Sequence, residues 1–160
     1  MSSQKTQTIQ VLQTNLLQEK QAFAELVELL AKERHALEHQ SMDALKSASE
    51  RKQHVTKNIE LLGQARTNAL KELSNKPLNN VSEIVKSLPM NVQKIWQQVL
   101  DLAEECHQSN LVNGKIIQIN KNRVARSLQL LKSQKADPGL TYSSTGIANT
   151  SRQAFKAIEA

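Results

Sequence analysis

The chain has 160 residues, a formal net charge of +6 and only 2% aromatic residues, with four glycines, three prolines and one cysteine. This length suits one domain, and the shortage of Gly and Pro leaves few turns, so the composition favours long helices. A single cysteine excludes an internal disulfide, the polar first ten residues argue against a signal peptide, and no apolar run approaches the ~18 residues of a membrane span, so we expect a soluble, cytoplasmic protein.

Residues 5–39 carry apolar residues at alternating steps of three and four, and no Pro or Gly interrupts them. This heptad spacing predicts one amphipathic helix, about 50 Å long at 1.5 Å per residue. Glu19 and Glu33 stand at two positions of the stripe where an apolar residue is expected. The other positions hold Ile9, Leu12, Leu16, Phe23, Leu26, Leu30 and Leu37.

Residues 42–73 show the same alternation, and Lys52 and Arg66 stand at two of its apolar positions. Ser41 can cap this second helix, and Asp43 suits the positive end of its dipole. Because the connection around residues 39–41 is short, we expect the two helices to fold back as an antiparallel hairpin. The stems of Lys52 and Arg66 are expected to extend over the groove between them.

A third long helix is predicted over residues 91–135, and one or two helical turns at 81–88, ended by Pro89, are predicted before it. Its first half has a regular apolar stripe from Val92 to Cys106. In its second half the stripe drifts round the helix, which predicts that this half does not simply continue the packing on the hairpin. The residues that interrupt the stripe are Asn110, Asn113, Gly114, Asn120 and Asn122.

The pattern as a whole predicts an all-α protein, with a coiled-coil-like helical bundle over residues 1–136 and a mobile tail over 137–160. The third helix is predicted to end at Asp137, Pro138 and Gly139, and the residues after them are rich in Ser, Thr and Ala.

Few residues suggest chemistry. His35 and His39 have a metal-binding spacing, but no Cys or carboxylate pair completes a site, so two exposed histidines at a helix end are the better interpretation. Cys106 falls on the apolar stripe and is expected to be a buried, unreactive thiol. The sequence has no Gly-rich phosphate loop, nucleophile elbow or close acid pair, so we predict no enzyme, no metal site and no cofactor.

All of the net charge lies in residues 111–160, which hold eight Lys and Arg against two Asp and Glu. Such a segment suits a nucleic acid, an anionic membrane or an acidic partner, or is a solvated helix face. No aromatic residue interleaves with the basic ones, and no short helix-turn-helix unit is visible. Apolar residues placed to meet a partner helix accompany the charge: Ile117, Val124, Leu128 and Leu131.

The C-terminal half also carries more specific motifs. Asn110-Leu111-Val112-Asn113-Gly114-Lys115-Ile116-Ile117 is similar to an N-x-x-N-G-x-apolar-apolar motif, and Leu128 and Leu131 match the leucines that follow it. Tyr142-Ser143-Ser144-Thr145-Gly146 is similar to a Tyr-x-x-x-Gly element, with Ser143 where Gly is frequent. With these motifs the chain resembles the FlgN family of flagellar export chaperones over about residues 8–146.

The resemblance implies a cytoplasmic protein that binds the hook–filament junction proteins FlgK and FlgL, prevents their early assembly and escorts them to the type III export apparatus. It also implies that the C-terminal part contacts the client. The site residues that we predict on this basis are Asn110, Asn113, Gly114, Ile117, Arg123, Val124, Leu128, Leu131 and Tyr142.

Other interpretations stay open beside the chaperone. A structural or adaptor coiled coil ranks second, a basic nucleic-acid-binding protein ranks third, and a homo-oligomer is compatible with all of them. For the chaperone, we expect the Asn113-Gly114 pair to weaken the third helix, since Gly costs about 1 kcal/mol against Ala, and to let the segment beyond it reorient around an amphipathic client helix.

Overall fold

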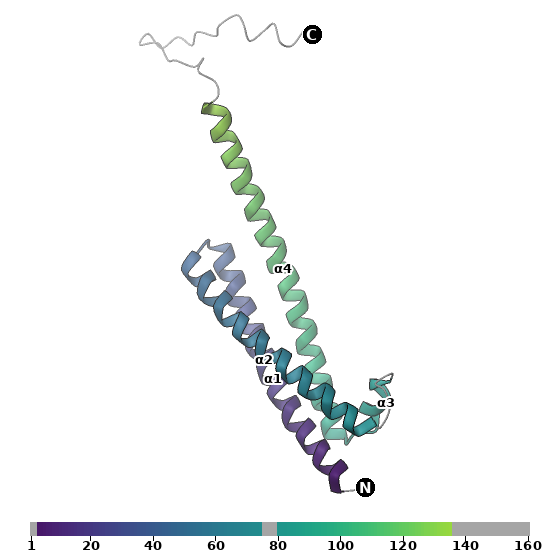
Figure 1. The fold of residues 1–160 in the computed structure, drawn as a ribbon. Coiled ribbons are helices and arrows are strands. Elements are labelled where there is room, and N and C mark those ends of the chain that lie inside the picture. The colour runs from purple at the N-terminus through teal and green to yellow at the C-terminus, as the bar shows by residue number, and fades with distance from the viewer. Residues whose placement is uncertain (1–2, 75–79, 136–160) are drawn as a thin grey trace, which may run out of the picture. The chain divides into compact units, whose positions relative to one another are not determined.

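The computed structural model describes residues 3–74 and 80–135, which form four helices (Figure 1): α1 (Ser3–Glu38), α2 (Met42–Ser74), α3 (Val81–Lys86) and α4 (Met90–Lys135). The described residues contain no strand, so the all-α prediction is confirmed. The chain divides into two compact units, Met1–Ile117 and Gln118–Ala160, and each is described by itself. The tail predicted over 137–160 lies outside the described residues.

Helices α1 and α2 form the predicted antiparallel hairpin, which is visible in Figure 1. The turn between them closes because the N–H of Ser41 donates to the carbonyl of Ala36 (3.0 Å), the long-range bond of a Schellman cap. Gln40 adopts the left-handed conformation that this cap requires (φ 54°), where Gly is the usual residue. Helix α2 then begins with a bond from the N–H of Leu45 to the carbonyl of Ser41 (3.0 Å).

The apolar core of unit 1 lies where the start of α1, the end of α2 and the start of α4 meet. Leu12, Leu16 and Val92 are fully buried there. Helix α3, the short turn expected before Pro89, packs against this core through partly buried aliphatic side chains. The remaining members of the buried cluster are Ile9, Ala69, Leu70, Leu88 and Val99.

Within unit 1, helix α4 runs in the same direction as α1. Val92, Val99, Cys106 and Asn113 are all buried and follow one another at intervals of seven. The thiol of Cys106 lies 3.5 Å from the carbonyl oxygen of Phe23, and the amide of Asn113 donates to the carbonyl oxygen of Leu30, 83 residues apart in both cases. A constant offset of this kind means parallel helices in one register.

This arrangement differs from the sequence interpretation at Asn113. We expected Asn113 to interrupt the apolar stripe, yet it occupies the fourth buried position of the heptad series. A polar residue can do so because neighbouring groups satisfy its amide. Helix α4 is also continuous through Asn113 and Gly114.

Candidate functional site

Polar side chains, as well as apolar ones, hold unit 1 together. Glu19 on α1 is almost fully buried, and the guanidinium of Arg66 on α2 lies 3.0 Å from one of its oxygens. The same guanidinium sits over the ring of Trp96 on α4, 5.4 Å from its centroid, within the range of a cation–π contact. Burial raises the pKa of Glu19, and the positive charge of Arg66 opposes that rise.

A second ion pair lies further along the hairpin, where Lys52 Nζ is 2.6 Å from a Glu33 oxygen. Glu19 and Glu33 are two heptads apart on α1, as are Lys52 and Arg66 on α2. Because the two helices are antiparallel and the two spacings are equal, Glu19 lies opposite Arg66 and Glu33 lies opposite Lys52. We expected the basic side chains only to extend over the groove, and this match of spacings was the signal for the pairing.

Asn113 joins α4 to the second ion pair. Its Nδ2 donates to the Leu30 carbonyl (2.9 Å) and to Glu33 Oε2 (2.7 Å), while its Oδ1 accepts from Arg34 Nε (3.1 Å). Its side chain is buried, so three protein partners replace the water that the amide gives up. This polar layer, which also contains Lys52, connects three helices and is specific to one alignment of them.

The predicted site residues of unit 1 therefore face different ways. Asn113 points into the bundle, whereas Asn110 and Gly114 are exposed and Ile117 is 36% exposed. A β-carbon at Gly114 would meet nothing within 4 Å, so no neighbour requires glycine there. The Asn113-Gly114 motif thus combines an inward hydrogen-bonding residue with an outward residue that has no side chain.

Unit 2 contributes the C-terminal part of α4. Every described side chain from Lys121 to Ser133 is exposed, including that of Arg123. At 3.6 residues per turn, Val124, Leu128 and Leu131 lie within about 60° of one another around the helix axis. They are 59%, 52% and 58% exposed, so three large aliphatic side chains form one open face. Tyr142 lies outside the described residues.

Comparison with known protein families identifies the family of this chain. A family model described as FlgN protein matches residues 1–150. The chain belongs to the FlgN family. The resemblance seen in the sequence is thereby confirmed, and membership indicates a flagellar export chaperone that binds flagellar proteins, in a family not known for enzyme activity. No curated protein and no solved structure matches the chain.

The other candidate sites of this FlgN-family chain offer little chemistry. The rings of His35 and His39 stack with centroids 4.0 Å apart, and no group of three or more His, Cys, Asp and Glu in the described ranges is placed to hold a metal. Cys106 is buried, as expected, and burial raises the pKa of its thiol to about 11, so it stays protonated at neutral pH. Among residues 3–74 and 80–135, no helix is long and apolar enough to cross a membrane.

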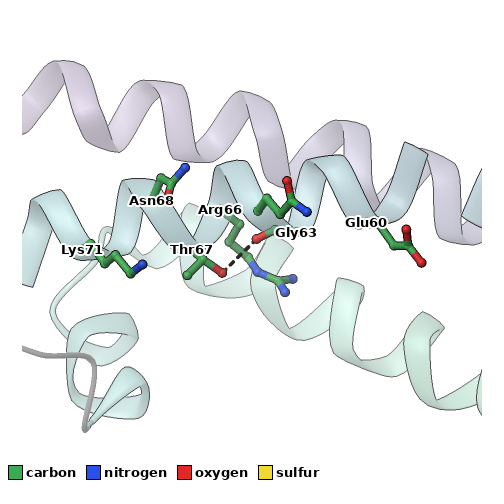
Figure 2. A pocket seen from close by; sticks show the side chains of 7 residues that line it. Glu60, Gly63, Arg66, Thr67, Asn68 and Lys71 are labelled. Atoms are coloured by element: carbon green, nitrogen blue, oxygen red, sulfur yellow. Dashed lines mark hydrogen bonds between the residues drawn. The ribbon is translucent and has the colours of Figure 1, made fainter. Parts of the chain in front are cut away.

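Figure 2 shows a shallow depression whose lining residues all belong to α2. The Thr67 hydroxyl within it donates to the Gly63 carbonyl (2.9 Å), and Arg66 is already paired with Glu19. Glu60 and Lys71 lie at its two ends, about 16 Å apart along the helix. Its charged groups are thus spread along one helix and do not converge on one point, so we assign it no reaction.

Proposed function

We propose that this chain is a cytoplasmic export chaperone for FlgK-like and FlgL-like hook–filament junction proteins. It holds apolar segments of the client, which prevents premature assembly, and delivers the client to the flagellar type III export apparatus. One observation carries the proposal beyond the family: Val124, Leu128 and Leu131 form an open aliphatic face in a segment without acidic residues. Large exposed apolar groups of this kind are typical of interaction sites.

The proposal divides the predicted residues by role. Val124, Leu128 and Leu131 supply apolar contact, and Arg123 attracts an acidic client surface and speeds the encounter. Ile117, the last residue of unit 1, is a further apolar contact. Asn110 and Tyr142 stay in the proposed site on the strength of the family motifs alone. Because α4 is continuous at Asn113 and Gly114, the client meets a formed helix.

Asn113 takes a positioning role in this proposal. Its amide is occupied by Leu30, Glu33 and Arg34, so its contribution is to hold α4 in register with α1. Buried asparagines in heptad positions set register in this way. Of the pair Asn113-Gly114, it is then the exposed Gly114 whose low helix propensity can affect client binding.

The test compares one pair of substitutions with a matched control pair. Leu128→Ala with Leu131→Ala is expected to weaken binding of a purified FlgK-like client ten- to a thousandfold, about 1.4–4 kcal/mol, because each leucine buries apolar area in the complex. Val11→Ala with Leu61→Ala removes equally exposed aliphatic groups (58% and 57%) from the hairpin and should leave binding unchanged. Calorimetric titration measures all three affinities.

A second variant separates the chaperone from a nucleic-acid binder. Arg123→Gln with Arg126→Gln should mainly slow client association and reduce its salt dependence, since steering charges act on the encounter. A phosphate binder would instead lose most of its affinity with these charges. If the leucine pair is silent, the arginine pair abolishes binding and RNA or DNA competes with the client, the chaperone site is wrongly assigned.

A further inference from the structure

Unit 2 has a second set of exposed aliphatic residues that the sequence interpretation did not single out. Ile119 is 54% exposed and Leu130 is 64% exposed. Eleven residues separate them, which at 3.6 residues per turn brings them within about 20° of one another around the helix. Their common direction lies about 140° from that of Val124, Leu128 and Leu131, so we call Ile119 and Leu130 the second face.

Two arginines flank this second face. Arg123 follows Ile119 by four residues, and Arg126 precedes Leu130 by four, so each arginine lies beside one of the aliphatic residues on the helix surface. No Asp or Glu occurs between Glu105 and Asp137. Aliphatic groups beside positive charge, in a segment whose own sequence has no acidic residue, are complementary to an amphipathic helix with acidic residues along the edge of its apolar side.

We propose that the second face docks a second acidic amphipathic segment of the same client molecule that occupies the first face. The identity of that client rests on the proposed function. When a helix has exposed aliphatic side chains on two sides, all of them leave water only if a partner covers both sides. The client thus encloses this part of α4.

Geometry favours one client molecule over two. A helix is about 10–12 Å across, so the path round it from one side to the other is about 16–19 Å, a distance that about five or six extended residues span. A client chain can therefore pass from one face to the other with a short connection. Once its first segment is bound, the second segment is present at a high effective concentration, which favours it over a segment from another molecule.

The experiment uses the full chain and a purified FlgK-like client. The second-face pair is Ile119→Ala with Leu130→Ala, the first-face pair is Leu128→Ala with Leu131→Ala, and the control pair is Val11→Ala with Leu61→Ala. All six positions are exposed and helical, and alanine favours helix, so folding should survive, which circular dichroism checks. We expect the second-face pair to weaken binding about 10- to 100-fold, the control pair to leave it unchanged, and the complex to contain one client per chain by light scattering.

The outcomes distinguish this inference from the proposed function. Loss of binding in the first-face pair alone overturns the second face and leaves the client site standing. Loss in the second-face pair alone supports the second face and overturns the first as a client site. Two clients per chain, or a free dimer that the second-face pair converts to a monomer, overturns the single-client arrangement.

Discussion

The two parts of α4 share one helix but use their apolar residues in opposite ways. In residues 90–117 the heptad positions are buried, from Val92 to Asn113. In residues 118–133 the large aliphatic side chains, such as Leu128 and Leu131, are exposed. Apolar content alone therefore does not separate a buried stripe from an exposed face. In the first part, Asn113 bonds with Leu30, Glu33 and Arg34 of α1, which accounts for the burial of a polar residue on the stripe.

The charge distribution separates the same two parts. Asp101, Glu104 and Glu105 give the first part of α4 an acidic stretch, whereas the second part contains only basic charges. Mixed charge suits a self-contained bundle, and charge of one sign suits a partner of the opposite sign. Substitutions in the first part should therefore affect stability, and substitutions in the second part should affect binding.

The largest stability effect is expected from Arg66→Met. It leaves the buried carboxylate of Glu19 without its partner, which in buried pairs costs 3–5 kcal/mol. Because the Arg66 side chain is 28% exposed, we expect a loss near the lower limit, about 3 kcal/mol of unfolding free energy. Urea denaturation followed by circular dichroism measures it.

The loss of unfolding free energy in Arg66→Met should be smaller at low pH. Burial already raises the pKa of Glu19, and removing Arg66 raises it further. Below that raised pKa the carboxyl group of the folded chain is neutral, so the cost of the unpaired charge declines as the pH falls through it and is gone at the ordinary pKa of 4.5. A loss that is the same at pH 7 and at low pH would assign the effect to packing on Trp96 instead.

A smaller destabilisation is expected from Asn113→Ala. The substitution removes three hydrogen bonds and leaves the Leu30 carbonyl buried without this donor, so we expect a loss of about 2 kcal/mol. Asn110→Ala, at an exposed position of the same motif, is the matched control and should change stability by less than about 0.5 kcal/mol. Equal effects at the two positions would contradict the buried polar layer.

Gly114→Ala should stabilise the protein. A β-carbon there meets nothing, so the gain in helix propensity, about 1 kcal/mol, is not offset by a clash. Gly63→Ala on α2 is the control, since its β-carbon would make only ordinary contacts at 3.8 Å. If client binding weakens in Gly114→Ala but not in Gly63→Ala, the glycine serves the reorientation that the sequence suggested; unchanged binding would argue for a rigid helix.

The smallest stability effect is expected from the first-face pair. Leu128→Ala with Leu131→Ala removes side chains that are already exposed. The free energy of unfolding of the free chain, measured by thermal unfolding, should therefore change by less than about 0.5 kcal/mol. The same pair is expected to show the largest effect on client affinity. A marked drop in melting temperature would mean that these leucines support the fold and are not free for a client.

Much of the fold was accessible from the sequence, because heptad spacing and a lack of turn residues determine helices locally. The hairpin, the short helix before Pro89 and the long final helix all follow from these patterns. The pairing of Glu19 with Arg66 and of Glu33 with Lys52 was also encoded, in the matched spacing of two heptads. We did not predict it, since each charge by itself resembles a defect in an apolar stripe.

By itself, the sequence determined the helices, their amphipathic faces, the basic end of the chain and the family motifs, because these depend on the order of residues along one helix. Only the tertiary structure decided that Asn113 belongs to the core, since the fate of a polar side chain depends on which groups a second helix brings within hydrogen-bond distance. It likewise decided that Ile119 and Leu130 are exposed. Periodicity shows that residues share a face, but burial depends on whether another part of the molecule covers that face.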